Sequence, residues 1–191
     1  CGFAKSDSSR ETPNLQFHVQ PISTDILGAT KLHDFDGITP TVANIRPTSR
    51  GEINIVSNNI KDYPKIKMNY LSTDDDRYVA AQGLKLVRKI MLETKTFKKY
   101  EPEEYRPGLH IKDDEELVKV GSDHTQTIFH PVGTCKMGKD ENSVVDEKLK
   151  VHGIENLRVI DASIMPNITS GNTNAPTIMI AEKGADMILG N

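Results

Sequence analysis

The stretch Ser170-Gly171-Asn172-Thr173-Asn174-Ala175-Pro176 stands before the last predicted helix of this 191-residue chain. Proline suits the first turn of a helix, and Thr173 or Asn174 suits the cap position. Upstream, a histidine opens a second stretch, His130-Pro131-Val132-Gly133-Thr134. Between the two, residues 157–160 are predicted to form a short buried strand before Asp161 and Ala162. The chain therefore ends in a predicted strand–loop–helix.

The rest of the chain is predicted to contain strands followed by helices. Residues 15–20 alternate apolar and polar side chains, as a half-buried strand does. Further strands are expected at 41–45, 51–56 and near 66–68, with loops at 22–40 and 97–112. A long helix is expected after a cap at Ser72 or Thr73, and a shorter one from Asp113 to about Thr125. This order indicates an α/β or α+β fold.

Helical spacing predicts which faces are buried. In the long helix the apolar positions are Val79, Gly83, Leu86, Val87 and Ile90. In the last helix the expected inner face consists of Ile178, Ala181, Ala185 and Ile188.

Composition excludes several classes of function. The net charge is −3, from 24 basic and 27 acidic residues, which argues against nucleic acid or an anionic membrane as a partner. No apolar run approaches the roughly 20 residues of a membrane helix. The two cysteines form no disulfide framework and favour a reducing, cytoplasmic location. The histidines lack metal-ligand spacing, so no metal site is expected.

Two runs, HPVGTCKMG at residues 130–138 and SGNTNAPTIMIAEK at 170–183, carry a family resemblance. The chain resembles the C-terminal part of the glucose–methanol–choline (GMC) family of FAD-dependent oxidoreductases. The choline-dehydrogenase-like and alcohol dehydrogenase subgroup is the most similar. The resemblance implies an α/β fold in two parts. Residues 1–141 are expected to belong to an α+β substrate domain with an antiparallel sheet backed by helices, and residues 142–191 to return to the FAD-binding domain.

The glycine-rich turn G-x-G-x-x-G, which binds the pyrophosphate of a dinucleotide, is absent. The 13 glycines are scattered singly, and the chain begins at Cys1. We therefore expect a C-terminal portion of a longer polypeptide, with an apolar surface exposed where the flavin domain packs.

The resemblance implies that His130 and Asn172 are catalytic. His130 is expected to act as the general base on an alcohol, because an imidazole accepts a proton near neutral pH. Asn172 is expected to orient the hydroxyl while a hydride passes to flavin N5. On residue chemistry alone, a structural hydrogen bond is the usual role of a histidine such as His130, and a turn or cap is the favoured role of Asn172. Asn174 competes with Asn172, from which it is two residues out of register.

Four residues are implied as FAD contacts: Asp161, Ala162, Thr173 and Asn174. The Asp161–Ala162 pair is expected to bond ribitol or phosphate oxygens, although an aspartate after a strand also caps turns. The backbone of Thr173 is expected near the pyrimidine end of the flavin, where the following helix directs its positive end.

The expected partners are a small alcohol substrate and an electron acceptor, which is a quinone, another acceptor or oxygen. Two other functions stay open. One is a non-catalytic, stand-alone module of the same fold. The other is a hydroxynitrile lyase of the GMC type, which has a histidine at the same place.

Purified residues 1–191 are expected not to retain FAD, because the pyrophosphate-binding turn is absent. The chain is mixed with excess FAD, passed through a gel-filtration column and scanned for flavin absorbance. A stoichiometric flavin spectrum that co-elutes with the protein contradicts this expectation.

Overall fold

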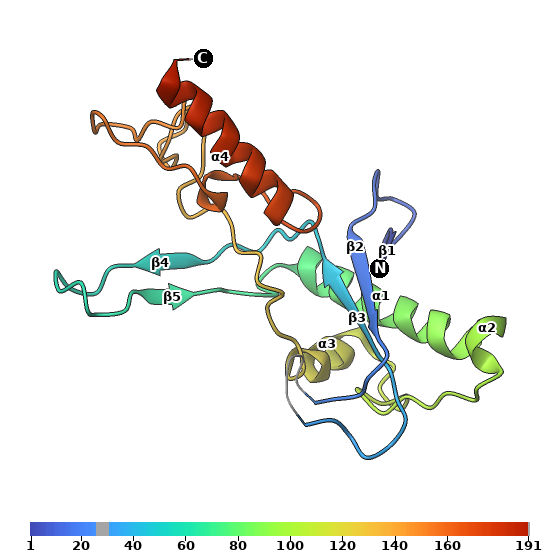
Figure 1. The fold of residues 1–191 in the computed structure, drawn as a ribbon. Helices are drawn as coiled ribbons and strands as arrows, with labels where there is room; N and C mark the ends of the chain where they lie inside the picture. Colours follow the sequence, from blue (N-terminus) through green and yellow to red (C-terminus); the bar gives the residue numbers. More distant parts are fainter. Residues whose placement is uncertain (26–30, 191) are drawn as a thin grey trace. The chain divides into compact units, whose positions relative to one another are not determined.

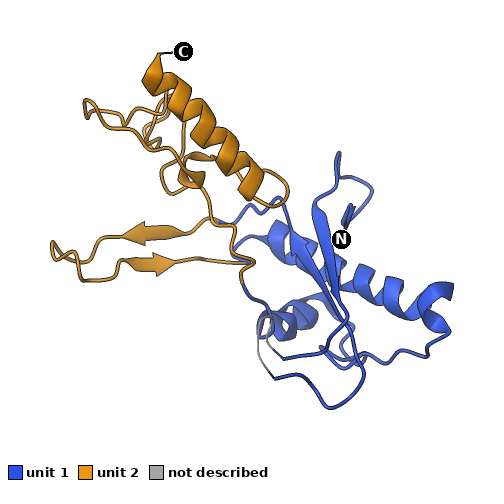
Figure 2. Cartoon of the chain, in the orientation of Figure 1, with its two compact units in different colours: residues 1–49, 71–126 blue, residues 50–70, 127–191 orange. Residues whose placement is uncertain are grey.

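The computed structural model describes residues 1–25 and 31–190, which form two compact units (Figures 1 and 2). Unit 1 comprises Cys1–Ser49 and Leu71–Gln126, and unit 2 comprises Arg50–Tyr70 and Thr127–Asn191. Residues 50–70 and 127–141 thus group with residues 142–191, whereas the sequence-based division falls at 141/142. The assignment of the two parts to substrate and FAD domains stays a prediction.

Unit 1 is an antiparallel sheet with helices against it. Its strands are β1 (Gly2–Ala4), β2 (Leu15–Gln20) and β3 (Thr39–Asn44), in the order β1-β2-β3. The helices are α1 (Asp74–Arg88), α2 (Lys95–Lys98) and α3 (Asp114–Ser122), with a π-helical turn at Lys89–Glu93. The mixed α/β fold expected from the sequence is confirmed. The predicted loop at 22–40 falls partly on residues 26–30, outside the described part of the chain.

Helix α1 packs on the sheet through small residues. A Cβ at Gly83 would lie 3.1 Å from a methyl group of Val42 and 3.3 Å from one of Leu15. Val79 and Ala81 are buried beside it, at 1% and 0% exposure. The glycine in this helix therefore permits a close approach of α1 to β2 and β3.

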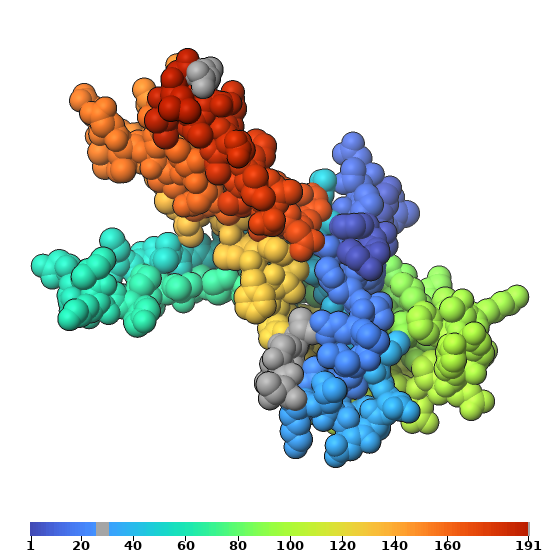
Figure 3. All heavy atoms as spheres, viewed as in Figure 1, coloured from blue at the N-terminus to red at the C-terminus, as the bar shows by residue number. Residues whose placement is uncertain are grey.

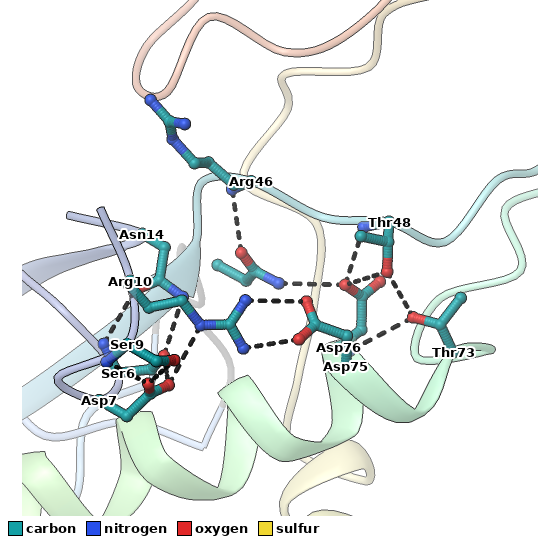
Figure 4. Close-up of polar contacts among 11 residues, drawn as sticks. Ser6, Asp7, Ser9, Arg10, Asn14, Arg46, Thr48, Thr73, Asp75 and Asp76 are labelled. Atoms are coloured by element: carbon teal, nitrogen blue, oxygen red, sulfur yellow. Dashed lines mark hydrogen bonds and ion pairs between the residues drawn. The ribbon is translucent and has the colours of Figure 1, made fainter. Parts of the chain in front are cut away.

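A buried carboxylate fixes the turn between β3 and unit 2. Asp76 in the first turn of α1 is 3% exposed and accepts a backbone N–H bond from Thr48 at 2.8 Å (Figure 4). It accepts a second one from Ser49, also at 2.8 Å. The Asn44 amide donates to it at 3.2 Å. Nearby, the Arg10 guanidinium binds Asp75 at 2.6 Å and holds the loop after β1 against the same helix (Figure 4).

Unit 2 contains a two-stranded ribbon, a short helix and a long helix. The ribbon pairs β4 (Glu52–Asn54) with β5 (Lys65–Lys67), and its side chains are exposed, as Figure 3 shows for one face. The 3-10 helix η2 (Ala162–Ile164) precedes α4 (Asn174–Leu189). Residues 132–165 are mostly irregular and pack with α4 around a core of Val145, Leu149, Ile164, Met165 and Ile180.

Two expectations for unit 2 are wrong. Residues 157–160 form no strand, because pairing there is limited to one bridge between Lys150 and Arg158, and Leu157 is 45% exposed. Helix α4 also presents a different face to the core.

Ile180 and Gly184 face inward on α4, whereas Ile178 and Ile188 are 54% and 60% exposed and Ala181 and Ala185 are exposed too. Both faces of this helix are apolar, so spacing alone does not select between them.

None of the helices in residues 1–25 and 31–190 combines the length and apolar character needed to cross a membrane.

Asp76→Asn is expected to destabilise the chain by about 2 to 3 kcal/mol, because two backbone N–H donors lose a charged acceptor. Burial acts to raise the pKa of Asp76, but hydrogen bonds from Ser49 and Thr48 outweigh it and hold the pKa below its ordinary 3.8. Asp76 therefore stabilises the fold above about pH 4, and this contribution is lost as the pH falls through the lowered pKa.

Urea unfolding at pH 7 and pH 3 measures both effects. The matched control is Asp74→Asn, since the Asp74 side chain is 97% exposed and is expected to change stability by less than about 0.5 kcal/mol. Equal stabilities of the two variants at pH 7 contradict the prediction.

Candidate active site

The backbone around His130 is held on both sides. Phe129 before it adopts a left-handed conformation with φ 64°, and Gly133 after it has φ 91°. The amide N–H of Cys135 donates to the carbonyl of Ser163 at 3.0 Å, and that of Met137 to Ile164 at 2.8 Å. Two turns and two hydrogen bonds to η2 thus fix the segment that carries the histidine.

The structure brings His130 and Asn172 together. The amide nitrogen Nδ2 of Asn172 lies 2.9 Å from Nε2 of the imidazole. The other ring nitrogen, Nδ1, lies 2.8 Å from the hydroxyl oxygen of Thr173. Two consecutive residues of the loop before α4 therefore contact the two nitrogens of one imidazole.

The three side chains differ in exposure. Thr173 is 8% exposed, His130 is half-buried, and Asn172 is exposed. The Nδ1 side of the ring thus contacts a buried residue, and the Nε2 side contacts an exposed one.

Asn174 occupies another position. It is the exposed first residue of α4, and the amide that reaches the imidazole belongs to Asn172. Of the two asparagines, Asn172 is therefore the one whose amide contacts His130.

Asp161 and Ala162 lie at the start of η2. A carboxylate oxygen of Asp161 accepts a hydrogen bond from the backbone N–H of Ser163 at 2.8 Å, so this aspartate caps the short helix. Ala162 packs against the core of unit 2. Their contact with FAD stays a prediction.

The beginning of α4 suits an electronegative group. Asn174 and Ala175 have no intrahelical carbonyl partner for their N–H groups. Among the described residues, the first backbone hydrogen bond of α4 runs from the N–H of Thr177 to the carbonyl of Thr173. No side chain of the described residues caps this end. Open N–H donors and the positive end of the helix dipole, next to His130, fit the electron-rich pyrimidine edge of a flavin.

Helix α4 is positioned by a close contact at Gly184. A Cβ at this position would overlap the side chain of Ile160, and Ile180 one turn earlier is 7% exposed. The packing of α4 on Ile160 places its N-terminal end, and with it Asn172 and Thr173, beside the histidine segment.

The opposite side of α4 carries an exposed apolar surface. Ile178, Met179, Ile188 and Leu189 are 54%, 59%, 60% and 73% exposed. Such a surface is the one expected from the sequence for a chain that packs against a further domain.

Sequence reasoning missed the side chain of Thr173, for which only a backbone role was expected. It also passed over a cluster in unit 1. Nδ1 of His33 lies 2.9 Å from the Ser23 hydroxyl, and Nε2 lies 3.0 Å from Asp25, which also pairs with Arg106 at 2.6 Å. The His33 hydrogen bond lowers the pKa of Asp25. These contacts connect Ser23, Asp25 and His33 to the loop after α2.

Comparison with known proteins gives a consistent family. Residues 47–181 match the family model described as GMC oxidoreductase. The chain is 43% identical over 189 residues to the oxygen-dependent choline dehydrogenase of Pseudomonas fluorescens. This match covers 99% of this chain and 33% of that protein. It is 45% identical over 188 residues to the alcohol dehydrogenase (acceptor) of Pseudomonas putida, and this match covers 98% of this chain and 34% of that protein. The chain spans about a third of the length of these curated relatives.

Solved structures of oxidases have a similar fold to this chain. Pyridoxine 4-oxidase from Mesorbium loti superimposes with a TM-score of 0.86 at 28% identity, over 99% of this chain and 37% of that chain. A formate oxidase does so with a TM-score of 0.84 at 30% identity, over 94% of this chain and 32% of that chain.

Gly184→Ala is expected to destabilise unit 2 by about 1 to 3 kcal/mol, because the added methyl group overlaps Ile160. Helix propensity alone predicts the opposite sign, a gain of about 1 kcal/mol. Thermal unfolding decides between the two, with Ala181→Gly on the exposed face as the control for propensity. A stabilised Gly184→Ala variant contradicts the close contact.

Proposed function

Since the chain belongs to the GMC oxidoreductase family, we propose that it forms part of an FAD-dependent enzyme that oxidises an alcohol to a carbonyl compound. The observation that supports this most directly is the 2.9 Å approach of the Asn172 amide to Nε2 of His130. Nε2 of His130 can accept a proton, and the adjacent amide N–H of Asn172 can donate a hydrogen bond to an oxygen. This pair matches the two needs of a hydroxyl group that is losing its proton.

His130 acts as the general base in this proposal. Its Nε2 accepts the hydroxyl proton as the C–H bond of the same carbon breaks. An imidazole suits this step, because it changes protonation near neutral pH. Its fixed backbone keeps the ring in one place while the proton transfers.

Asn172 orients the substrate. Its amide N–H donates to the alcohol oxygen, which gains negative charge as the proton leaves. An amide is uncharged at every relevant pH, so it stabilises this charge without competing for the proton. The same amide holds Nε2 before substrate binds and turns to the oxygen when the alcohol arrives.

FAD, when bound, accepts the hydride from the substrate carbon. In this chain the residues suited to hold it are the open N-terminal residues of α4, Asn174 and Ala175, beside the backbone of Thr173. Asp161 and Ala162 are proposed to face the dinucleotide side. A carbonyl product, a proton on His130 and a reduced cofactor complete the balance.

The substrate class follows from the relatives. The names choline dehydrogenase and alcohol dehydrogenase support a primary alcohol as substrate, with an acceptor such as a quinone or oxygen receiving the electrons. Choline is one candidate among these alcohols. The aromatic side chains of this chain make up 5% of its sequence and do not by themselves indicate a cage for a quaternary ammonium group.

In the full-length enzyme, His130→Ala is expected to lower kcat by roughly two to four orders of magnitude, the usual contribution of a general base. Steady-state rates with a series of primary alcohols measure the loss.

His152→Ala is the matched control, because His152 is exposed and its imidazole lies 3.1 Å from the Gly138 carbonyl, away from the His130 ring contacts. A His130→Ala enzyme within tenfold of wild type removes His130 from the proposed role. Cyanohydrin cleavage without any alcohol oxidation supports a lyase instead, and a wild-type protein that binds FAD but is inert supports a non-catalytic module.

A further inference from the structure

The hydroxyl of Thr173 does not serve its usual purpose at the start of a helix. Thr173 occupies the N-cap position of α4, where a threonine oxygen ordinarily accepts a hydrogen bond from the second or third helical N–H. Here its side chain makes no cap bond, and the oxygen lies 2.8 Å from Nδ1 of His130 instead.

Proline and the backbone of Thr173 together explain the change of partner. Thr173 has a helical backbone, with φ −94° and ψ −3°, instead of the extended one from which a cap side chain reaches the second or third N–H. The third residue of α4 is Pro176, which has no N–H to donate. Helix α1 provides the comparison within the same chain. There the N-cap Thr73 accepts from the N–H of Asp76, the third residue, at 3.2 Å. The same residue type at the same position thus caps α1 but is directed to the histidine at α4.

The second nitrogen of the ring fixes the direction of the bond. The amide Nδ2 of Asn172 is a donor only, so Nε2 of His130 accepts at 2.9 Å and carries no proton. A neutral imidazole with a bare Nε2 has its proton on Nδ1. Nδ1 therefore donates to the Thr173 oxygen, which is 8% exposed and protected from competing water.

We infer that Thr173 is a positioning residue that holds His130 in the tautomer whose Nε2 lone pair faces the substrate side. Its link to catalysis rests on the proposed function of His130, whereas the tautomer itself does not. No ion pair of His130 occurs among the described residues, so the two neutral contacts set the orientation. An orienting partner on the far nitrogen is how other catalytic histidines are kept in the right tautomer.

The first test is direct and needs no variant. Long-range proton–nitrogen NMR spectra of ¹⁵N-labelled residues 1–191, at a pH where the ring is neutral, report which nitrogen of His130 carries the proton. The proton is expected on Nδ1. A predominantly Nε2-protonated ring overturns the inference, whatever role His130 has in catalysis.

Substitutions then test Thr173 itself. Thr173→Val keeps the branched shape and removes the oxygen, and it is expected to populate the Nε2-protonated ring as the Asn172 amide rotates to present its oxygen. Thr173→Ser restores the oxygen and is expected to restore Nδ1 protonation. Thr73→Val is the matched control, because it removes a helix-capping hydroxyl in unit 1 and leaves His130 unchanged. An unchanged His130 spectrum in Thr173→Val overturns the inference.

In the full-length enzyme, separate effects on kcat and KM distinguish the positioning role of Thr173 from a purely structural role. Thr173→Val is expected to lower kcat roughly tenfold, the scale of one neutral hydrogen bond, with KM changed less than about threefold. Thr173→Ser is expected to stay within about twofold of wild type in kcat. A serine variant as slow as the valine variant contradicts the role of the hydroxyl. If His130→Ala is itself without effect, the proposed function fails while the tautomer result stands.

Discussion

The site depends on one imidazole whose two nitrogens bond two consecutive residues. Thr173 holds Nδ1 at 2.8 Å and Asn172 reaches Nε2 at 2.9 Å. Because both partners belong to the loop before α4, the position of the histidine is tied to the position of that helix. The glycine at 184 lets the helix approach Ile160, and the turn at Gly133 brings the histidine segment to η2. The geometry around His130 is therefore a consequence of packing in unit 2.

Unit 1 is stabilised in a different way. Its central constraint is the buried Asp76, which gathers the N–H groups of Thr48 and Ser49 just before the chain enters unit 2. Each unit thus has a buried polar group that orders a loop, a carboxylate in one and a threonine hydroxyl in the other. The exposed apolar residues of α4 and the exposed β4–β5 ribbon are features of a chain that spans about a third of its relatives' length.

Much of this was predictable from the sequence. The family and FAD as its cofactor are confirmed by the comparisons, and residues 130–138 and 170–183 carried the resemblance from which both were predicted. Strand β2 and a helix start after Ser72 or Thr73 were also predicted, and Thr73 is the cap, since alternation and capping are local signals. Two failures have a common cause. The inner face of α4 and the absence of a strand at 157–160 are decided by packing against other parts of the chain. In α4, apolar residues on two faces leave the helical spacing without a single preferred side. Thr173 was missed because its hydroxyl role appears only when the missing N–H of Pro176 and the location of His130 are considered together.

A crystal structure of the full-length enzyme with FAD and a bound alcohol or substrate analogue tests the account most directly. The account predicts one substrate oxygen within about 3 Å of both Nε2 of His130 and the Asn172 amide, with Thr173 still bonded to Nδ1. A substrate oxygen that lies against other residues, with His130 and Asn172 still paired to each other and out of reach, contradicts it.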